Sequence, residues 1–274
     1  MENDLKKKVT TWLETQGYPL EMRVASALRE VGFDVSQGEY YDDPETQTAR
    51  EIDVIAVKRD KYGLLEISIV VECKKSADKP WVLFTSEMHE SGKNKIFTYA
   101  IMSVSAREKL IKKVIDKSTR DLLWLNKPKR TAYGMAVAFA KGEDPAYKAA
   151  LSALKASISQ NNSSTDTDLS RSLRFIFPVL VMDGNLFEAY LDKRGNTVVQ
   201  EIDEGAVTYY REISGCPVSS VRIVTTKRLD SFCEEAFEEA IQIEILLNDD
   251  IEKMWQQLKD SQDGIRRIRF TKPS

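Results

Sequence analysis

Histidine and cysteine are scarce in this chain of 274 residues, which has one histidine and three cysteines. His89 alone cannot support catalysis that relies on a pair of histidines, nor can it form a histidine-rich metal cluster. Cys73, Cys216 and Cys233 form no Cys-x-x-Cys pair, which argues against a zinc site and a disulfide framework. Any bound metal is therefore expected to be held by carboxylates, which favours Mg²⁺ or Mn²⁺.

Long apolar runs are absent as well. None approaches the roughly 20 residues that span a bilayer, and residues 1–8 are polar and charged, unlike the start of a signal peptide. We therefore expect a cytoplasmic protein with no membrane partner. With 42% hydrophobic and 30% charged residues, the composition is that of a folded globular protein.

The net charge of −3 hides an uneven distribution of charge along the chain. Residues 74–130 contain 14 Lys and Arg against 6 Asp and Glu, whereas residues 1–73 contain 9 against 15. A basic middle beside an acidic start is compatible with a phosphate-binding face next to an acidic metal pocket. The densest basic part, from Arg107 to Lys117, is equally compatible with the solvated side of one helix.

Hydrophobic periodicity and turn residues predict an α/β chain with two regions. The first region, residues 1–160, is expected to contain helices at 3–16, 20–31, 94–117 and 145–159, and strands at 33–41, 51–57, 64–73 and 133–140. A stretch rich in Ser, Asn and Thr, residues 159–172, indicates a linker. The second region, residues 173–274, is expected to be α+β, with a hairpin at Asp183-Gly184-Asn185, strands at 197–202 and 221–225, and a closing helix at 229–258.

Three charged side chains stand out within the predicted strands. Alternation places Glu72 and Lys74 on one face of their strand, opposite an apolar face. A turn at residues 58–63 would join this strand to the preceding one and bring Asp53 near Glu72. Two buried carboxylates side by side call for a cation, and Lys74 could hold a water or a phosphate oxygen beside it. This arrangement is suited to phosphodiester hydrolysis.

The same residues resemble the signature of a known family. Asp53, in Arg-Glu-Ile-Asp, and Glu72-Cys73-Lys74 are similar to the D…ExK motif of PD-(D/E)xK nucleases, and most of all to that of Mrr-like restriction endonucleases. The resemblance covers roughly residues 18–140. It implies a restriction-endonuclease-like core of helix, three-stranded mixed sheet, helix and strand, with an α+β region appended. Ile52 stands where the proline of the family name would be.

The resemblance implies a Mg²⁺-dependent endonuclease that hydrolyses DNA in restriction or anti-phage defence. Asp53 and Glu72 would bind the metal, Lys74 would orient the attacking water, and Glu21 on the upstream helix would complete the metal and catalytic set. Mn²⁺ is expected to substitute for Mg²⁺. Cleavage of RNA or branched DNA is an alternative, and so is a nucleic-acid-binding module that lacks catalysis.

Further expectations concern partners and the surroundings of the site. Arg50 and Lys75 could contact phosphates, and Trp81 could stack on a base or serve as a packing anchor, whereas Glu51 is interpreted as solvated. Residues 173–274 are assigned to target recognition or self-association, and a homodimer would supply the two active sites of a double-strand break. Because no phosphate-binding loop occurs, any sensor or motor activity would belong to a partner chain.

Overall fold

The computed structural model describes residues 2–87, 96–115, 130–140, 144–162, 172–216 and 218–260. In these parts of the chain nine strands form one mixed sheet, in the order β1-β2-β3-β5-β8-β9-β6-β4 with β7 beside β6. The strands are β1 (Asp34–Asp42), β2 (Ala49–Arg59), β3 (Leu65–Glu87), β4 (Ile101–Met102), β5 (Arg130–Val137), β6 (Leu173–Leu191), β7 (Thr197–Ile202), β8 (Glu204–Tyr209) and β9 (Ser219–Thr225). The helices are α1 (Glu2–Thr15), α2 (Tyr18–Val31), α3 (Ile96–Tyr99), α4 (Val104–Ile115), α5 (Pro145–Asn162) and α6 (Leu229–Asp260). The predicted mixed α/β fold is confirmed, and its sheet is larger than the three-stranded one expected.

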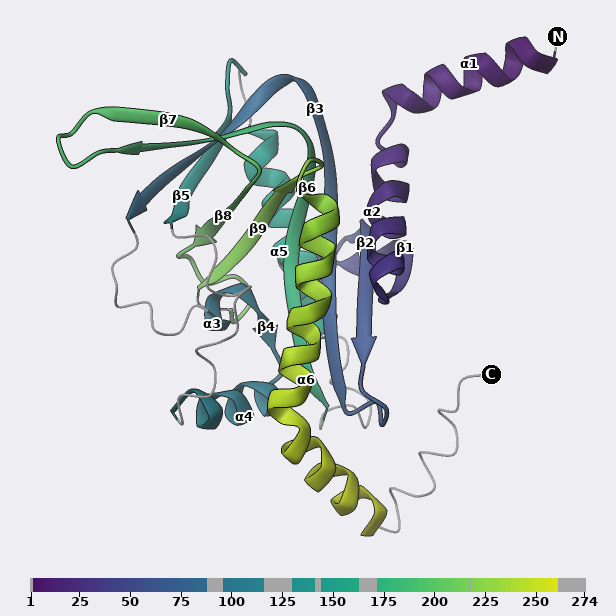
Figure 1. The fold of residues 1–274 in the computed structure, drawn as a ribbon, viewed down its shortest axis with the longest axis vertical. Helices are drawn as coiled ribbons and strands as arrows, with labels where there is room; N and C mark the ends of the chain where they lie inside the picture. Colours follow the sequence, from purple (N-terminus) through teal and green to yellow (C-terminus); the bar gives the residue numbers. More distant parts are fainter. Residues whose placement is uncertain are drawn as a thin grey trace.

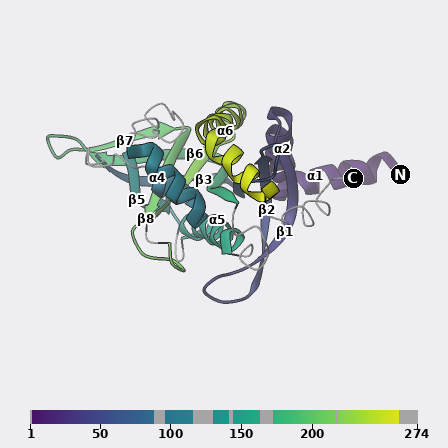
Figure 2. The same ribbon diagram turned by 90° about the horizontal axis from the view of Figure 1, so that it is seen from below.

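Helices cover both faces of the sheet (Figures 1 and 2). Helices α2 and α6 pack on one face, where Leu28 and Phe232 join the side chains of Ile67 and Ile69 in one apolar cluster. Helix α5 covers the other face with a row of buried alanines, Ala146, Ala149, Ala150, Ala153 and Ala156. Burial on both faces explains the nearly continuous apolar runs of the central strands.

The 23-residue strand β3 connects two parts of the sheet. Its first half pairs with β2, its second half pairs with β5, and β6 runs parallel along its other edge. The pairings β3–β5, β5–β8, β8–β9, β9–β6 and β6–β3 close a ring of five strands. The predicted strand at 64–73 is thus only the first part of a much longer one.

The predicted long helix at 94–117 is wrong within the described residues. The chain forms α3, the short strand β4 and then α4, because Ile101 pairs with Ile176 of β6. The Ser103 hydroxyl accepts a hydrogen bond from the Ala106 amide (3.3 Å), which caps the start of α4. Residues 94–95 and 116–117 lie outside the described part, as do most of the basic residues between 88 and 129.

The predicted hairpin at Asp183-Gly184-Asn185 is also wrong, because β6 runs without a break from Leu173 to Leu191. Gly184 lies beside Ser76, at the point where the register between β3 and β6 shifts. A Cβ atom on Gly184 would lie 2.5 Å from the Ser76 carbonyl oxygen. The glycine is therefore needed for a close approach of two backbones, not for a turn. Strand β8 was not predicted.

Gly184→Ala is expected to destabilise the protein by about 1–3 kcal/mol, because the added methyl group meets backbone that cannot move aside cheaply. Gly134→Ala is the matched control, since a Cβ atom there meets nothing closer than Phe84 Cδ2 at 3.8 Å. Urea unfolding of both variants measures the difference. Equal midpoints for the two variants would contradict the close approach at Gly184.

The two predicted regions share the sheet. Strand β6, from the second region, lies along β3, from the first. The predicted linker falls mostly at residues 163–171, which lie outside the described part. Residues 173–260 therefore complete the sheet that carries β3, in addition to any role in recognition or self-association.

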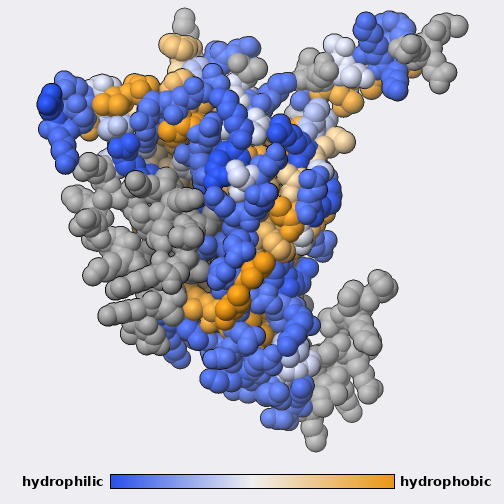
Figure 3. All heavy atoms as spheres, in the orientation of Figure 1, coloured by the Kyte–Doolittle hydropathy of each residue, from blue (hydrophilic) through white to orange (hydrophobic). Residues whose placement is uncertain are grey.

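Large apolar side chains are exposed at two places on the surface. Helix α1 extends away from the body and exposes Leu5, Val9 and Trp12 (Figure 1). In Figure 3, apolar side chains also show near β6 and β7, where Leu191 and Val199 are exposed. In the described part of the chain, no helix combines the length and apolar character needed to cross a membrane.

Candidate active site

The candidate site forms where β2 parts from β3. The pairing between the two strands ends at Val54 and Val71, one residue short of Asp53 and Glu72. Beyond that point the backbone of β2 no longer pairs with β3. The Asp53 side chain instead accepts a hydrogen bond of 2.6 Å, through Oδ2, from the Cys73 amide. Asp53 is thus tied to the middle of the Glu-x-Lys segment, as predicted from the hairpin.

A break in the alternation of β1 and β2 turns Asp53 toward β3. Val54 packs in the cluster beneath α2 and α6, whereas Ile52 packs in the cluster beneath α5. Strict alternation would place both on one face. Asp53 lies at this change of face, opposite Gly38, whose φ of +65° suits glycine. The change of face lets the Asp53 carboxylate reach the Cys73 amide.

Strand β3 itself keeps the predicted alternation. Val71 and Cys73 are buried in the cluster beneath α2 and α6, and Glu72 points to the opposite face. Glu72 is only 7% exposed, and its Oε1 forms an ion pair with Lys74 Nζ at a distance of 2.7 Å. The Lys74 side chain is 42% exposed, so it connects a buried carboxylate to solvent.

Burial disfavours the charged forms of both carboxylates of the site. Burial raises the pKa of Glu72, and Lys74 only partly offsets this effect. Burial also raises the pKa of Asp53, against the hydrogen bond from the Cys73 amide. Loss of contact with water makes ionisation of Asp53 and of Glu72 less favourable. The negative charge of Asp53 raises the pKa of Glu72 further.

Glu21 belongs to the same electrostatic group. It lies in the first turn of α2, and its pKa is raised by burial and then by the charges of Asp53 and Glu51. The charge of Lys74 lowers the pKa of Glu21. Burial lowers the pKa of Lys74 itself and the charge of Glu72 raises it, and the pKa of Lys74 is raised overall. The predicted residues Glu21, Asp53, Glu72 and Lys74 are therefore brought within electrostatic reach of one another.

Glu51 is a further carboxylate whose charge acts on the site. It is exposed, as expected, but its charge raises the pKa of both Glu21 and Asp53. Its Oε1 lies 3.3 Å from the position that a Cβ atom on Gly38 would take. Alternation already placed Glu51 on the same face as Asp53, and its position at the start of the strand favoured a solvated side chain, which the structure confirms.

Two carboxylates of this site, those of Asp53 and Glu72, could hold a metal ion together with water molecules. In the described parts of the chain, no three His, Cys, Asp or Glu side chains are grouped closely enough to hold a metal by themselves. Mg²⁺ is commonly bound by one or two carboxylates and keeps several waters. Asp53 and Glu72 could supply the carboxylates, and Asp53 Oδ1 is not used by the Cys73 amide.

Comparison with models of protein families, with curated proteins and with solved structures finds no match for this chain.

The weaker candidates have different surroundings. Lys75 is exposed next to Asp183 of β6. Trp81 is 2% exposed and lies in the cluster beneath α5, so the packing alternative applies and its ring cannot stack on a base in this conformation. Arg50 is held by an ion pair with Asp43 at the end of β1. His89 lies outside the described residues.

Proposed function

We propose that this protein is a metal-dependent endonuclease that hydrolyses phosphodiester bonds in DNA, with Mg²⁺ as its cofactor. The observation that supports it best is the meeting of Asp53, Glu72 and Lys74 at the point where β2 and β3 separate. Carboxylates that are buried with raised pKa values are costly to ionise, and such groups concentrate at functional sites. The resemblance to the PD-(D/E)xK motif agrees with this chemistry.

The proposed roles follow from the position of each side chain. Asp53 and Glu72 would hold Mg²⁺, and Glu21 would contribute through water from α2. The ion, when bound, lowers the pKa of a water molecule and offsets the charge of the phosphate. Lys74, half exposed and paired with Glu72, would hold the attacking water or a phosphate oxygen and stabilise the added negative charge.

Cleavage of supercoiled plasmid tests the proposal. Nicked or linear DNA is expected with Mg²⁺ and with Mn²⁺, and intact plasmid is expected with EDTA. Single-stranded RNA and a branched DNA junction, tested in the same buffers, would identify the alternative substrates. If none of the three substrates is cut with either metal, the nuclease proposal fails and a binding module on the same fold is favoured.

A role in restriction or anti-phage defence, with residues 173–274 serving recognition or self-association, is part of the same proposal. A homodimer would place two sites on a duplex, whereas a monomer would nick it. Sedimentation of the protein with and without DNA separates these cases. Linear product from a protein that stays monomeric on DNA would contradict the homodimer.

A further inference from the structure

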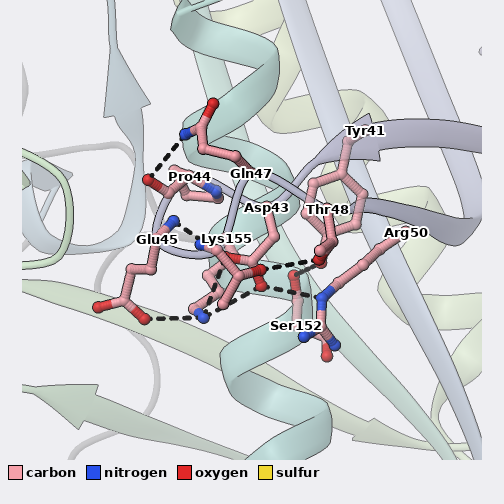
Figure 4. Close-up of polar contacts among 10 residues, drawn as sticks. Tyr41, Asp43, Pro44, Glu45, Gln47, Thr48, Arg50, Ser152 and Lys155 are labelled. Atoms are coloured by element: carbon pink, nitrogen blue, oxygen red, sulfur yellow. Dashed lines mark hydrogen bonds and ion pairs between the residues drawn. The ribbon is translucent and has the colours of Figure 1, made fainter.

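A buried ion-pair cluster joins the loop after β1 to helix α5 (Figure 4). Asp43 has no exposed surface. Its Oδ1 accepts hydrogen bonds from the amides of Glu45 (2.9 Å) and Thr46 (3.1 Å), and both carboxylate oxygens lie 3.2 Å from Lys155 Nζ. Arg50 Nε lies 2.9 Å from Asp43 Oδ2. The carboxylate is therefore fixed from several directions.

The cluster contains two carboxylates, Asp43 and Glu45, and two cations, Lys155 and Arg50. Lys155, a buried lysine of α5, pairs with Asp43 and also with Glu45 at 2.7 Å. Burial acts to raise the pKa of Asp43, yet the two amides and Lys155 together lower it. Because the two amides and Lys155 hold the Asp43 carboxylate in place, Arg50 pairs with an acceptor whose position is fixed.

Within the described part of the chain, Asp43 is the ion-pair partner of Arg50 and approaches it at one edge of the guanidinium. A guanidinium carries five N–H donors, and the ion pair with Asp43 uses the one on Nε at closest approach. The Arg50 side chain remains 49% exposed. A planar guanidinium that is held along one edge and open along another is well suited to a phosphate.

The cluster lies on the side of the sheet to which Glu72 points. Arg50 of β2 pairs with Tyr41 of β1, and Tyr41 packs in the same cluster beneath α5 as Val70. The hydroxyl of Tyr41 donates to the Ser152 carbonyl of α5 at 3.5 Å, and the charge of Glu72 is among the causes that raise the pKa of Tyr41 to about 12. Arg50 precedes Asp53 by three residues on β2, roughly 10 Å along the strand.

That separation corresponds to about three nucleotides of a bound strand, because nucleotides rise about 3.4 Å each along B-DNA. We propose that Arg50 contacts a DNA phosphate a few nucleotides from the scissile one, and that Asp43, itself held by Lys155, is the residue that positions it. This inference rests on the proposed nuclease function and adds a substrate contact to it.

Arg50→Ala tests the contact, and Arg59→Ala is its matched control. Arg59 lies at the other end of β2, its side chain is also 49% exposed, and it pairs with Glu66 at 2.8 Å. Binding of a fluorescein-labelled DNA duplex is measured in the Asp53→Asn background with Mg²⁺, so that cleavage does not interfere. Arg50→Ala is expected to weaken binding about tenfold and to lower the slope of log K against log salt by about 1. Arg59→Ala is expected to change neither.

Asp43→Asn tests the positioning role in a double-mutant cycle. It should weaken DNA binding when Arg50 is present and have no further effect in the Arg50→Ala variant. Arg50→Lys keeps the charge but loses the planar guanidinium whose Nε pairs with Asp43, and we expect an intermediate affinity. If Asp43→Asn does not fold, the comparison of Arg50→Ala, Arg50→Lys and Arg59→Ala decides alone, with thermal unfolding to confirm that these variants fold.

The outcomes separate this inference from the nuclease proposal. Equal binding losses for Arg50→Ala and Arg59→Ala, or none for either, would overturn the Arg50 contact even if the wild-type protein cuts DNA. Binding of RNA but not DNA with the same dependence on Arg50 would overturn the choice of DNA. A wild-type protein that binds neither polymer would overturn both proposals.

Discussion

Lys74→Ala is expected to lower the rate of Mg²⁺-dependent plasmid cleavage by about 10²–10⁴-fold. Lys74 is the cation that pairs with Glu72 in the described part of the chain. In the proposed mechanism its loss leaves the attacking water and the added charge on the phosphate without this partner. Initial rates of nicking, with kcat and KM determined separately, measure the loss. We expect it mainly in kcat, since this interaction belongs to the transition state.

Lys75→Ala is the matched control for Lys74→Ala. The two lysines are adjacent on β3, but alternation directs Lys75 to the other face, beside Asp183. Loss of its charge should change KM modestly and leave kcat close to that of the wild-type protein. If the two variants lose the same rate, general attraction of DNA by positive charge, and not a catalytic lysine, would account for the result.

Asp53→Asn is expected to stabilise the metal-free protein near neutral pH and to abolish stabilisation by Mg²⁺. Burial raises the pKa of Asp53 above its ordinary value, so the folded state binds more protons than the unfolded state between those two values. Stability therefore falls as pH rises through that window, and the full cost is present above the folded-state pKa. Asparagine carries no charge, and its Oδ1 can still accept from the Cys73 amide.

Thermal unfolding with and without Mg²⁺ measures both effects. A wild-type protein at a Mg²⁺ concentration about 100 times the Kd should gain about 2.7 kcal/mol, and the variant should gain little. The gain should shrink at acid pH, where protonated carboxylates no longer bind the ion. A variant that is less stable than the wild type and keeps its response to Mg²⁺ would show that Asp53 has a structural role and does not bind the metal.

The local pattern of β3 was sufficient to predict how its side chains divide. Alternation over residues 65–74 placed Glu72 and Lys74 together, and both lie on the same face in the structure. The hairpin turn before β3 also brought Asp53 to this level. These predictions succeeded because each depends on residues that are close in sequence.

The errors came from contacts between distant segments. The change of face at Asp53 depends on Gly38 of β1, and the pattern of β2 alone contains no sign of it. Asp183-Gly184-Asn185 has a sequence typical of a turn, but Gly184 is needed because the Ser76 backbone of β3 lies too close to allow a Cβ atom there. Likewise, the pairing of Ile101 with Ile176 interrupts a helix that local periodicity favoured. Hydrophobic patterning carries no information about such partners.

The parallel pairing of β3 with β6 has a consequence for the order of folding. Leu65 pairs with Leu173, and Glu72 pairs with Leu180, so the strand that carries the candidate site waits for a partner more than a hundred residues later. Contacts of such long range slow folding, because a large loop must close before they form. During synthesis, the ribosome must release β6 before β3 can be enclosed. A nascent chain that ends before residue 173 therefore lacks the strand that pairs with one edge of β3. The proposed DNA cleavage should begin only after most of the protein has been made.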